Sequence, residues 1–227
     1  MKAVVLLSGG LDSTTCLALA IKKYGRENVS TVSIFYGQRH EIELEHAKKV
    51  SAHYDVKNYV FDAAEIMKHS DSALLNSSEK NLSPTTYGEQ VKKNPRVETY
   101  VPFRNGLMIS MAASFADGLY PGEDIEIFLG VHRDDSAVNA YPDCSKEFID
   151  AMSSAVSIGT YGKIKLVAPF VGKTKSDVVK AGLELGAPYE LTRSCYERTE
   201  KPCGKCATCL DRAKAFADNG IEDPALS

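Results

Sequence analysis

The feature that most constrains this chain is a short apolar run that ends at two glycines near the N-terminus. Residues 3–7 are all apolar, and Ser8-Gly9-Gly10-Leu11-Asp12-Ser13 follows them directly. Two glycines let the backbone turn tightly and bring its N–H groups close to an anion. The Ser8 and Ser13 hydroxyls and the first turn of a following helix add further donors and a favourable dipole. The pattern therefore predicts a buried strand, a phosphate-binding loop and a helix, in that order.

Asp12 stands inside this loop. A carboxylate there repels a phosphate when it is alone, so we expect Asp12 to hold the Mg²⁺ that accompanies ATP. The alternative is a strand-to-helix turn that needs small residues for steric reasons alone. A Walker A loop is excluded, because it requires glycine five residues before Gly172 and that position holds Val167. Lys173 and Lys175, which follow Gly172, remain candidates to approach ATP.

Short apolar runs alternate with amphipathic segments along the whole chain. Strands are expected at residues 3–7, 29–35, 59–61, 125–130 and 165–169. Helices are expected at residues 12–24, 41–54, 105–117, 146–156, 175–185 and 207–217. This alternation predicts an α/β fold, an open parallel sheet with helices on both faces. Thr174 and Asp177 predict a capping box, and helices are expected to stop at Gly25, Gly118 and Gly186.

Composition excludes several classes of protein. The formal net charge is -3, so there is no global basic surface for nucleic acid. No apolar run approaches the length of a membrane span. The N-terminal apolar run ends at Ser8, too soon for a signal peptide. We therefore expect a cytoplasmic protein, and in a reducing compartment its six cysteines favour metal binding over disulfides.

Four of these cysteines gather near the end of the chain. They are Cys203, Cys206 and Cys209 at C-x-x-C-x-x-C spacing and Cys195 eight positions upstream. Four thiolates suit one tetrahedral zinc and leave no open position for chemistry, which makes the site structural. An iron–sulfur cluster with ferredoxin spacing would need Cys where Ala213 stands; unliganded core thiols are the third alternative. We expect a nucleotide-binding domain over residues 1–188 and a small helical zinc-binding segment over residues 189–227.

A third polar constellation follows the strand expected at residues 125–130. It contains Tyr141-Pro142-Asp143-Cys144. Ligands of open α/β sheets bind beyond the carboxyl ends of the strands, where this segment is expected. The Asp143 carboxylate can pair with a guanine-like N–H edge, with Cys144 nearby. The alternative is a loop that caps a helix and carries an incidental thiol.

These motifs together carry a family resemblance. The opening loop resembles the PP-loop of ATP pyrophosphatases, which have an adenine-nucleotide α-hydrolase fold. Along nearly its whole length the chain resembles the QueC family of 7-cyano-7-deazaguanine synthases, through segments at residues 8–13, 36–40, 100–105, 141–144, 194–196 and 203–209. The resemblance implies that ATP, with Mg²⁺, and ammonia convert 7-carboxy-7-deazaguanine to the nitrile through adenylated intermediates, for queuosine or archaeosine synthesis. It also implies a four-cysteine zinc and a homodimer.

The resemblance also implies a set of site residues. Nucleotide binding is assigned to Ser8, Gly9, Gly10, Leu11, Asp12, Ser13, Tyr36 and Gln38. The catalytic set is Asp12, Arg39, His40, Arg104 and Asp143, and the substrate-binding set is Arg104, Asn105, Tyr141, Asp143 and Cys144. Guanidinium forks match phosphate and carboxylate, so Arg39 and Arg104 are expected to contact one of these; surface ion pairs are the alternative. His40 is expected to orient a phosphate or relay a proton, whereas His46 and His53 are expected to be solvated.

Two departures from the family pattern leave the acceptor open. Ser145 stands where many relatives have arginine, and residues 132–135 also differ. A related ligase that forms an amide with a different amine is therefore the alternative. A PP-loop enzyme acting directly on tRNA is disfavoured by the acidic balance. A non-enzymatic zinc module leaves the N-terminal loop unexplained.

Overall fold

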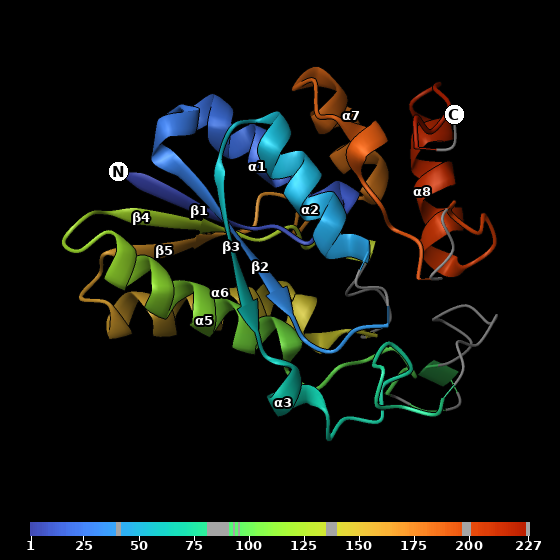
Figure 1. The fold of residues 1–227 in the computed structure, drawn as a ribbon, viewed down its shortest axis with the longest axis horizontal. Coiled ribbons are helices and arrows are strands. Elements are labelled where there is room, and N and C mark those ends of the chain that lie inside the picture. The colour runs from blue at the N-terminus through green and yellow to red at the C-terminus, as the bar shows by residue number, and fades with distance from the viewer. Residues whose placement is uncertain are drawn as a thin grey trace.

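The computed structural model of the chain contains a sheet of five parallel strands in the order β3-β2-β1-β4-β5 (Figure 1). It describes residues 1–39, 42–80, 91, 92, 94, 96–134, 140–196 and 201–225. The strands are β1 (Lys2–Leu6), β2 (Val29–Phe35), β3 (Lys57–Asp62), β4 (Ile125–Phe128) and β5 (Ile164–Val167). The five expected strands are confirmed, with β3 longer than its three-residue apolar run suggested.

The strand order of the sheet reverses at the central strand β1. From β1 the chain winds outward through β2 and β3, then returns to β4 on the other side of β1. Val4 is in register with Ser30 of β2 and with Ile127 of β4. Because the connections that leave β1 and β4 diverge, a crevice opens beyond their carboxyl ends, the usual ligand site of such sheets.

Helices cover both faces of the sheet (Figure 1). One face carries α1 (Leu11–Tyr24), α2 (Ile42–His53) and α7 (Lys175–Glu184), and α8 (Ala207–Asp218) packs on α7. The other carries α5 (Arg104–Leu119) and α6 (Lys146–Gly159). Short helices are α3 (Ala64–Met67), η1 (Arg26–Asn28), η3 (Pro142–Cys144) and η4 (Tyr189–Leu191). No helix in the described ranges is long and apolar enough to cross a membrane.

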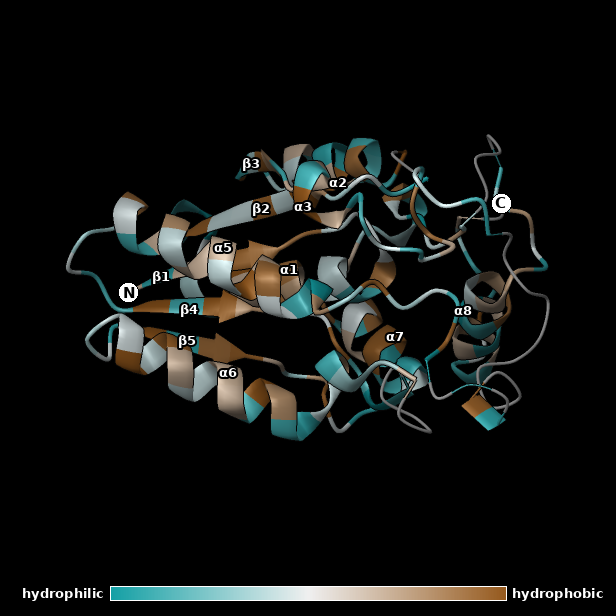
Figure 2. Ribbon diagram, turned by 90° about the horizontal axis from the view of Figure 1, so that it is seen from below, coloured by the Kyte–Doolittle hydropathy of each residue, from teal (hydrophilic) through white to brown (hydrophobic). Residues whose placement is uncertain are grey.

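Apolar side chains of β1 supply the core on both faces. Ala3, Val5 and Leu7 pack against α1, α2 and α7, while Val4 and Leu6 pack against α5 and α6. Ala3 to Leu6 of β1 are all apolar and buried, as expected for a strand covered on both faces. β4 and β5 are also mostly apolar, brown in Figure 2, although each contains one charged residue.

The C-terminal helix α8 contributes to the same core as the first helix. Phe216 is fully buried in the cluster that contains Leu17 of α1 and Val178 of α7. Its ring meets the Tyr189 ring edge-on at 5.3 Å. The division into a nucleotide-binding domain and a zinc-binding segment at residue 188 stays a prediction. The two parts share this apolar contact.

Helix ends follow the expected chemistry with one exception. The capping box of α7 is confirmed, since Thr174 Oγ1 accepts from the Asp177 N–H at 3.2 Å and the Asp177 carboxylate accepts from the Thr174 N–H at 2.8 Å. Gly25 and Gly186 adopt positive φ where α1 and α7 stop. The expectation for Gly118 is wrong, because α5 continues through it to Leu119.

Candidate active site

A cavity of about 250 Å³ lies at the carboxyl ends of β1 and β4. The opening loop and the segments after β2 and β4 form part of its wall, and so do α5, α7 and the stretch before the cysteine cluster. Site residues expected from the sequence that line it are Ser8, Gly10, Asp12, Ser13, Tyr36, Gln38, Arg104, Asn105, Tyr141 and Cys144. The structure thus brings ten of the expected residues to one cavity.

The opening loop holds its own donors in a compact arrangement. The Ser8 and Ser13 hydroxyl oxygens lie 3.1 Å apart, and the Gly10 N–H donates to Ser8 Oγ at 3.3 Å. Gly10 has extended backbone geometry and starts α1. The hydroxyls and the first N–H groups of a helix are therefore gathered where an anion is favoured.

Close packing against two neighbouring elements requires glycine in this region. Gly9 has φ of +89°, and a Cβ there would lie 2.3 Å from the Glu43 carbonyl oxygen of α2. After β4, a Cβ on Gly130 would lie 2.9 Å from the Asp12 carbonyl carbon and the Ser13 nitrogen. Since backbone atoms cannot give way cheaply, the loop is fixed between α2 and the end of β4.

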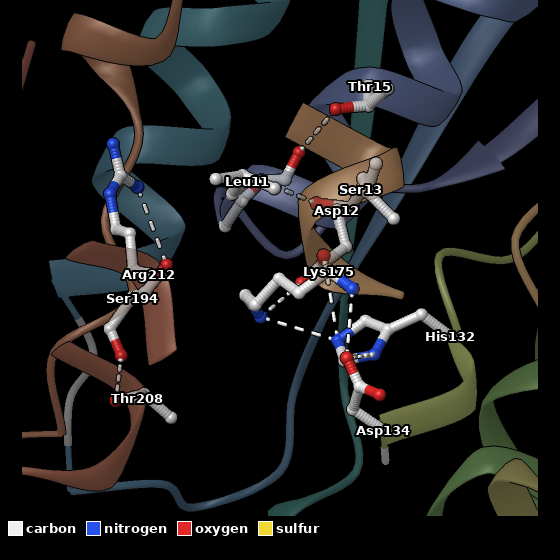
Figure 3. A network of polar contacts seen from close by, with 12 residues as sticks. Leu11, Asp12, Ser13, Thr15, His132, Asp134, Lys175, Ser194, Thr208 and Arg212 are labelled. Atoms are coloured by element: carbon white, nitrogen blue, oxygen red, sulfur yellow. Dashed lines mark hydrogen bonds and ion pairs between the residues drawn. The ribbon is translucent and has the colours of Figure 1, made fainter. Parts of the chain in front are cut away.

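Asp12 lies in a small charged network shown in Figure 3. Lys175 Nζ is 3.1 Å from Asp12 Oδ2 and 3.3 Å from His132 Nε2, and His132 Nε2 is 3.7 Å from Asp12 Oδ1. Burial alone would raise the pKa of Asp12, but the Lys175 ammonium and His132 hold it below its ordinary value. Asp12 is therefore ionised at neutral pH. Its Oδ1 is buried and has no hydrogen-bond partner in the part of the chain that the structure describes.

Arg104 contributes a buried positive charge to the cavity wall. Its Nη1 donates to the Tyr36 hydroxyl at 3.3 Å, and its guanidinium carbon lies 5.4 Å from the centre of that ring. Burial acts to lower the pKa of Arg104, but Tyr36, Cys144 and Asp143 raise it overall. Arg104 therefore stays a cation, with its guanidinium plane supported by an aromatic face.

Asp143 lies beside this wall rather than on the cavity surface. It is buried, and its Oδ2 accepts from the Asn105 N–H at the start of α5 at 3.0 Å. Asn105 Nδ2 donates in turn to the Asp143 carbonyl at 3.1 Å and to Cys144 Sγ at 3.2 Å. A carboxylate at a helix N-terminus satisfies an N–H group and complements the helix dipole. Pairing of Asp143 with a guanine-like edge stays a prediction.

Two further expected residues do not line the cavity. The Arg39 guanidinium donates to the carbonyls of Leu75 at 2.9 Å and Ser78. Leu11 is fully buried in the core beneath the loop. His40 lies outside the described residues. The roles assigned to these three side chains remain predictions.

Two histidines of α2 differ from one another. His53 is exposed, as expected. The expectation for His46 is wrong, because it is half-buried and its Nδ1 lies 2.6 Å from the Leu191 carbonyl oxygen. The helix is polar in sequence, but η4 covers it at this position, a tertiary contact that helical periodicity cannot reveal.

Other cavity residues come from the C-terminal part of the chain, around the cysteine cluster. Arg193, Ser194, Tyr196 and Thr208 line the cavity, and Lys175 joins them from α7. Ser194 and Tyr196 belong to a segment that matches the family, whereas no motif of the sequence points to Arg193 or Thr208. The only local signal is that both lie close in sequence to cysteines of the cluster.

The four cysteines near the C-terminus converge as expected. The sulfur atoms of Cys195, Cys203, Cys206 and Cys209 all lie within 4.8 Å of one another, and no disulfide joins them. A tetrahedral zinc with bonds of ~2.3 Å needs sulfur atoms roughly 3.8 Å apart, so the donor set fits this metal. Backbone N–H groups of Lys205 and Cys206 hold the pKa of Cys203 at about 7, against the opposing effect of burial. Such N–H···S contacts favour the thiolate that a metal requires.

Comparison with known proteins gives a consistent result. A family model described as Queuosine biosynthesis protein QueC matches residues 2–220. 7-Cyano-7-deazaguanine synthase of Archaeoglobus fulgidus is 40% identical over 228 residues, covering 100% of this chain and 90% of that protein. The synthases of Caldicellulosiruptor saccharolyticus and Persephonella marina are 41% and 42% identical, covering 99% and 97% of this chain and 94% of each relative.

Proposed function

The chain belongs to the QueC family, and we propose that its cavity binds ATP at the opening loop and 7-carboxy-7-deazaguanine at the Arg104 end. The reaction is the formation of 7-cyano-7-deazaguanine, catalysed by a ligase that makes carbon–nitrogen bonds. One observation carries the placement: the loop with Asp12 and the wall with Arg104 line a single cavity at the switch point of the sheet.

The chemistry explains why ATP is needed. A carboxylate resists attack because an oxide is a poor leaving group. Attack of a carboxylate oxygen on the α-phosphorus of ATP forms an acyl adenylate and releases pyrophosphate. Ammonia then displaces AMP and loses a proton, which gives the amide. The amide oxygen then attacks the α-phosphorus of a second ATP, which releases pyrophosphate and, with loss of one N–H proton, gives an adenylated imidate. Loss of AMP and of the remaining N–H proton leaves the nitrile.

The opening loop supports the pyrophosphate side of this reaction. Its hydroxyls and the start of α1 present donors to an anion that gains charge as the bond to the α-phosphorus breaks. Lys175 adds a positive charge 3.1 Å from Asp12. These groups are already in position before ATP arrives, because Gly9 and Gly130 fix the loop against α2 and β4. Preorganised donors of this kind cost little reorganisation during the reaction.

The residues present fit a magnesium ion at Asp12. The carboxylate is ionised, and its buried Oδ1 lacks a hydrogen bond within the described part of the chain. A hard oxygen donor of this type suits Mg²⁺, which usually keeps several waters and bridges to phosphate oxygens. When bound, the ion would neutralise phosphate charge. Asp12 would hold it, and Lys175 would then balance the remaining negative charge.

Arg104 is proposed to receive the carboxylate of the acceptor. Its guanidinium is charged and held by Tyr36, so the fork is preoriented for a planar anion. Asn105, Tyr141 and Cys144 form the adjoining wall, where the purine-like ring would lie.

We also infer a zinc at the four cysteines, a homodimer and a cytoplasmic location. Small molecules, rather than nucleic acid, are the expected partners.

Incubation of the protein with 7-carboxy-7-deazaguanine, ATP, Mg²⁺ and ammonium tests the activity. Mass spectrometry is expected to show the nitrile, with two AMP formed for each nitrile. Omission of ammonium is the control and should leave neither nitrile nor amide. Amide without nitrile would contradict the second adenylation, and absence of both products would contradict the proposed substrate.

A further inference from the structure

An irregular segment connects the cavity to the cysteine cluster. Residues 192–196, which we name the wall segment, belong to no helix or strand. Arg193, Ser194 and Tyr196 line the cavity, whereas Cys195 belongs to the four-cysteine cluster. Neighbouring residues of one short segment therefore contribute to both sites.

On the cavity side, the wall segment is bonded to the nucleotide loop through its main chain. The Arg193 N–H donates to the Gly9 carbonyl at 3.0 Å. The carbonyl and N–H of one trans peptide point in opposite directions. Anchoring the Gly9 carbonyl on Arg193 therefore directs the Gly10 N–H into the loop, where it donates to Ser8 Oγ. The orientation of this loop peptide thus depends on where Arg193 lies.

On the other side, the cysteine cluster holds the wall segment. Thr208 stands between two cysteines of the cluster, and its hydroxyl donates to the Ser194 carbonyl at 2.6 Å. The same hydroxyl oxygen is 3.3 Å from Cys206 Sγ. Figure 3 shows Thr208 directed at Ser194. A ligand loop and the wall segment are thus joined next to the sulfur atoms.

A buried arginine of α8 completes the attachment. Arg212 Nη1 donates to Thr192 Oγ1 at 2.7 Å and to Ser194 Oγ at 3.4 Å, and the guanidinium pairs with the Asp223 carboxylate at 2.7 and 2.9 Å. Arg212 and Asp223 are both buried. The wall segment is therefore held by α8 and by the cysteine cluster, and it in turn holds Gly9.

We propose that the four-cysteine centre, once it has bound its metal, positions the nucleotide loop through the wall segment. The inference rests on the proposed function, because it presupposes that ATP binds at the loop. An irregular segment has no ladder of backbone bonds to restore its position, so its geometry depends on its few side-chain anchors. Metal at Cys195 and its partners fixes two of these anchors, Cys195 itself and Thr208. The metal then contributes to ATP affinity without touching ATP.

ATP affinity of the full-length protein tests this coupling. Equilibrium dialysis with Mg-ATP, in the absence of acceptor, is performed on zinc-loaded wild type and on zinc-loaded Thr208→Val. The variant loses the hydroxyl contacts with the Ser194 carbonyl and Cys206 Sγ but keeps all four cysteines. It is expected to retain zinc, with ATP binding about three- to tenfold weaker. The control is Thr31→Val, which also removes a threonine hydroxyl: Thr31 is buried, bonds Asn58 at 2.8 Å and does not line the cavity. It should leave the affinity unchanged.

Hydrogen exchange distinguishes positioning from direct contact, because Thr208 also lines the cavity. Without ATP, exchange in residues 8–13 should be faster in Thr208→Val and in chelated wild type, while residues of β4 keep wild-type rates. Unchanged exchange in residues 8–13 of the zinc-loaded variant overturns the proposal, whatever its ATP affinity. If circular dichroism shows that chelation unfolds the protein, the test rests on the comparison between zinc-loaded wild type and zinc-loaded Thr208→Val. Failure of zinc-loaded wild type to bind ATP instead rejects the proposed function and the coupling together.

Discussion

The two ends of the cavity are built in different ways. At the proposed nucleotide end, six consecutive residues, Ser8 to Ser13, form a loop whose shape follows from glycine geometry and a helix start. At the proposed acceptor end, Tyr36, Arg104 and Cys144 come from three segments far apart in the sequence. A local motif specifies the first arrangement, whereas only tertiary packing specifies the second.

This difference determines what a motif residue does. In the loop, the proposed contacts to phosphate come largely from main-chain N–H groups, so the spacing of small residues is informative by itself. At the acceptor end, the chemical type of a side chain does not show whether it faces a ligand or supports its neighbours. Arg104 lines the cavity, while Asp143, from an equally distinctive motif, bonds the start of α5.

The largest effect is expected at the nucleotide end, from Asp12→Asn. Loss of the charge removes the proposed magnesium ligand and the partner of Lys175. We expect kcat/KM for ATP to fall on the order of 100-fold or more, as when a preorganised charge-stabilising group is lost. Steady-state kinetics with varied ATP measures this. Asp62→Asn, an exposed carboxylate that caps α3, is the control and should stay within about twofold of wild type. Wild-type kinetics for Asp12→Asn would contradict the proposed role of Asp12 in binding Mg²⁺ and ATP.

The next effect concerns the shape of the loop. Gly9→Ala combines a positive φ with a Cβ 2.3 Å from the Glu43 carbonyl oxygen, so α2 must move. We expect a loss of about 3 kcal/mol or more in the free energy of unfolding. Gly162→Ala is the matched control, because Gly162 has φ of +77° and nothing within 4 Å of its Cβ position. That control should lose only about 1 kcal/mol in urea titrations. Equal losses would show that packing against α2 does not determine the loop.

The sequence predicted the sheet, the six long helices and the loop because each depends on local pattern. Apolar β1 followed by two glycines is such a pattern, and so is the spacing of Cys203, Cys206 and Cys209. It did not predict the place of Arg193, whose main chain contacts Gly9 across 184 positions of sequence. Periodicity reports which residues are apolar, but not which distant backbone they will meet.

Asp143 at the acceptor end provides a smaller, separate test. Asp143→Ala leaves the Asn105 N–H without its acceptor, and we expect a loss of about 1–2 kcal/mol of stability. Asp143→Asn retains an acceptor oxygen and should lose less. Urea unfolding and the KM for the deazaguanine are measured for both variants. If Asp143 instead pairs with a guanine-like edge, Asp143→Asn will raise that KM as much as Asp143→Ala does, with stability nearly unchanged.

The smallest expected effect is a pH dependence of stability that arises from His46 of α2, the helix that packs against the opening loop. Burial lowers the pKa of His46 below 6.5; the Leu191 carbonyl opposes this, and Lys49 and Arg193 reinforce it. As pH falls below 6.5, the unfolded chain therefore takes up the proton before the folded protein does. The free energy of unfolding is therefore highest above pH 6.5, where His46 is neutral in both states. It decreases as pH falls from 6.5 toward the pKa of His46 in the folded protein.

Urea midpoints at pH 7.5 and 5.5 measure this contribution. His46→Gln has no proton to take up, so its midpoint should fall less between the two values than that of wild type. His53→Gln changes an exposed histidine of the same helix and should retain the wild-type difference. If His46→Gln behaves like wild type, His46 is not buried beneath η4 in solution, because burial is the main cause that lowers its pKa and the Leu191 carbonyl acts in the opposite direction.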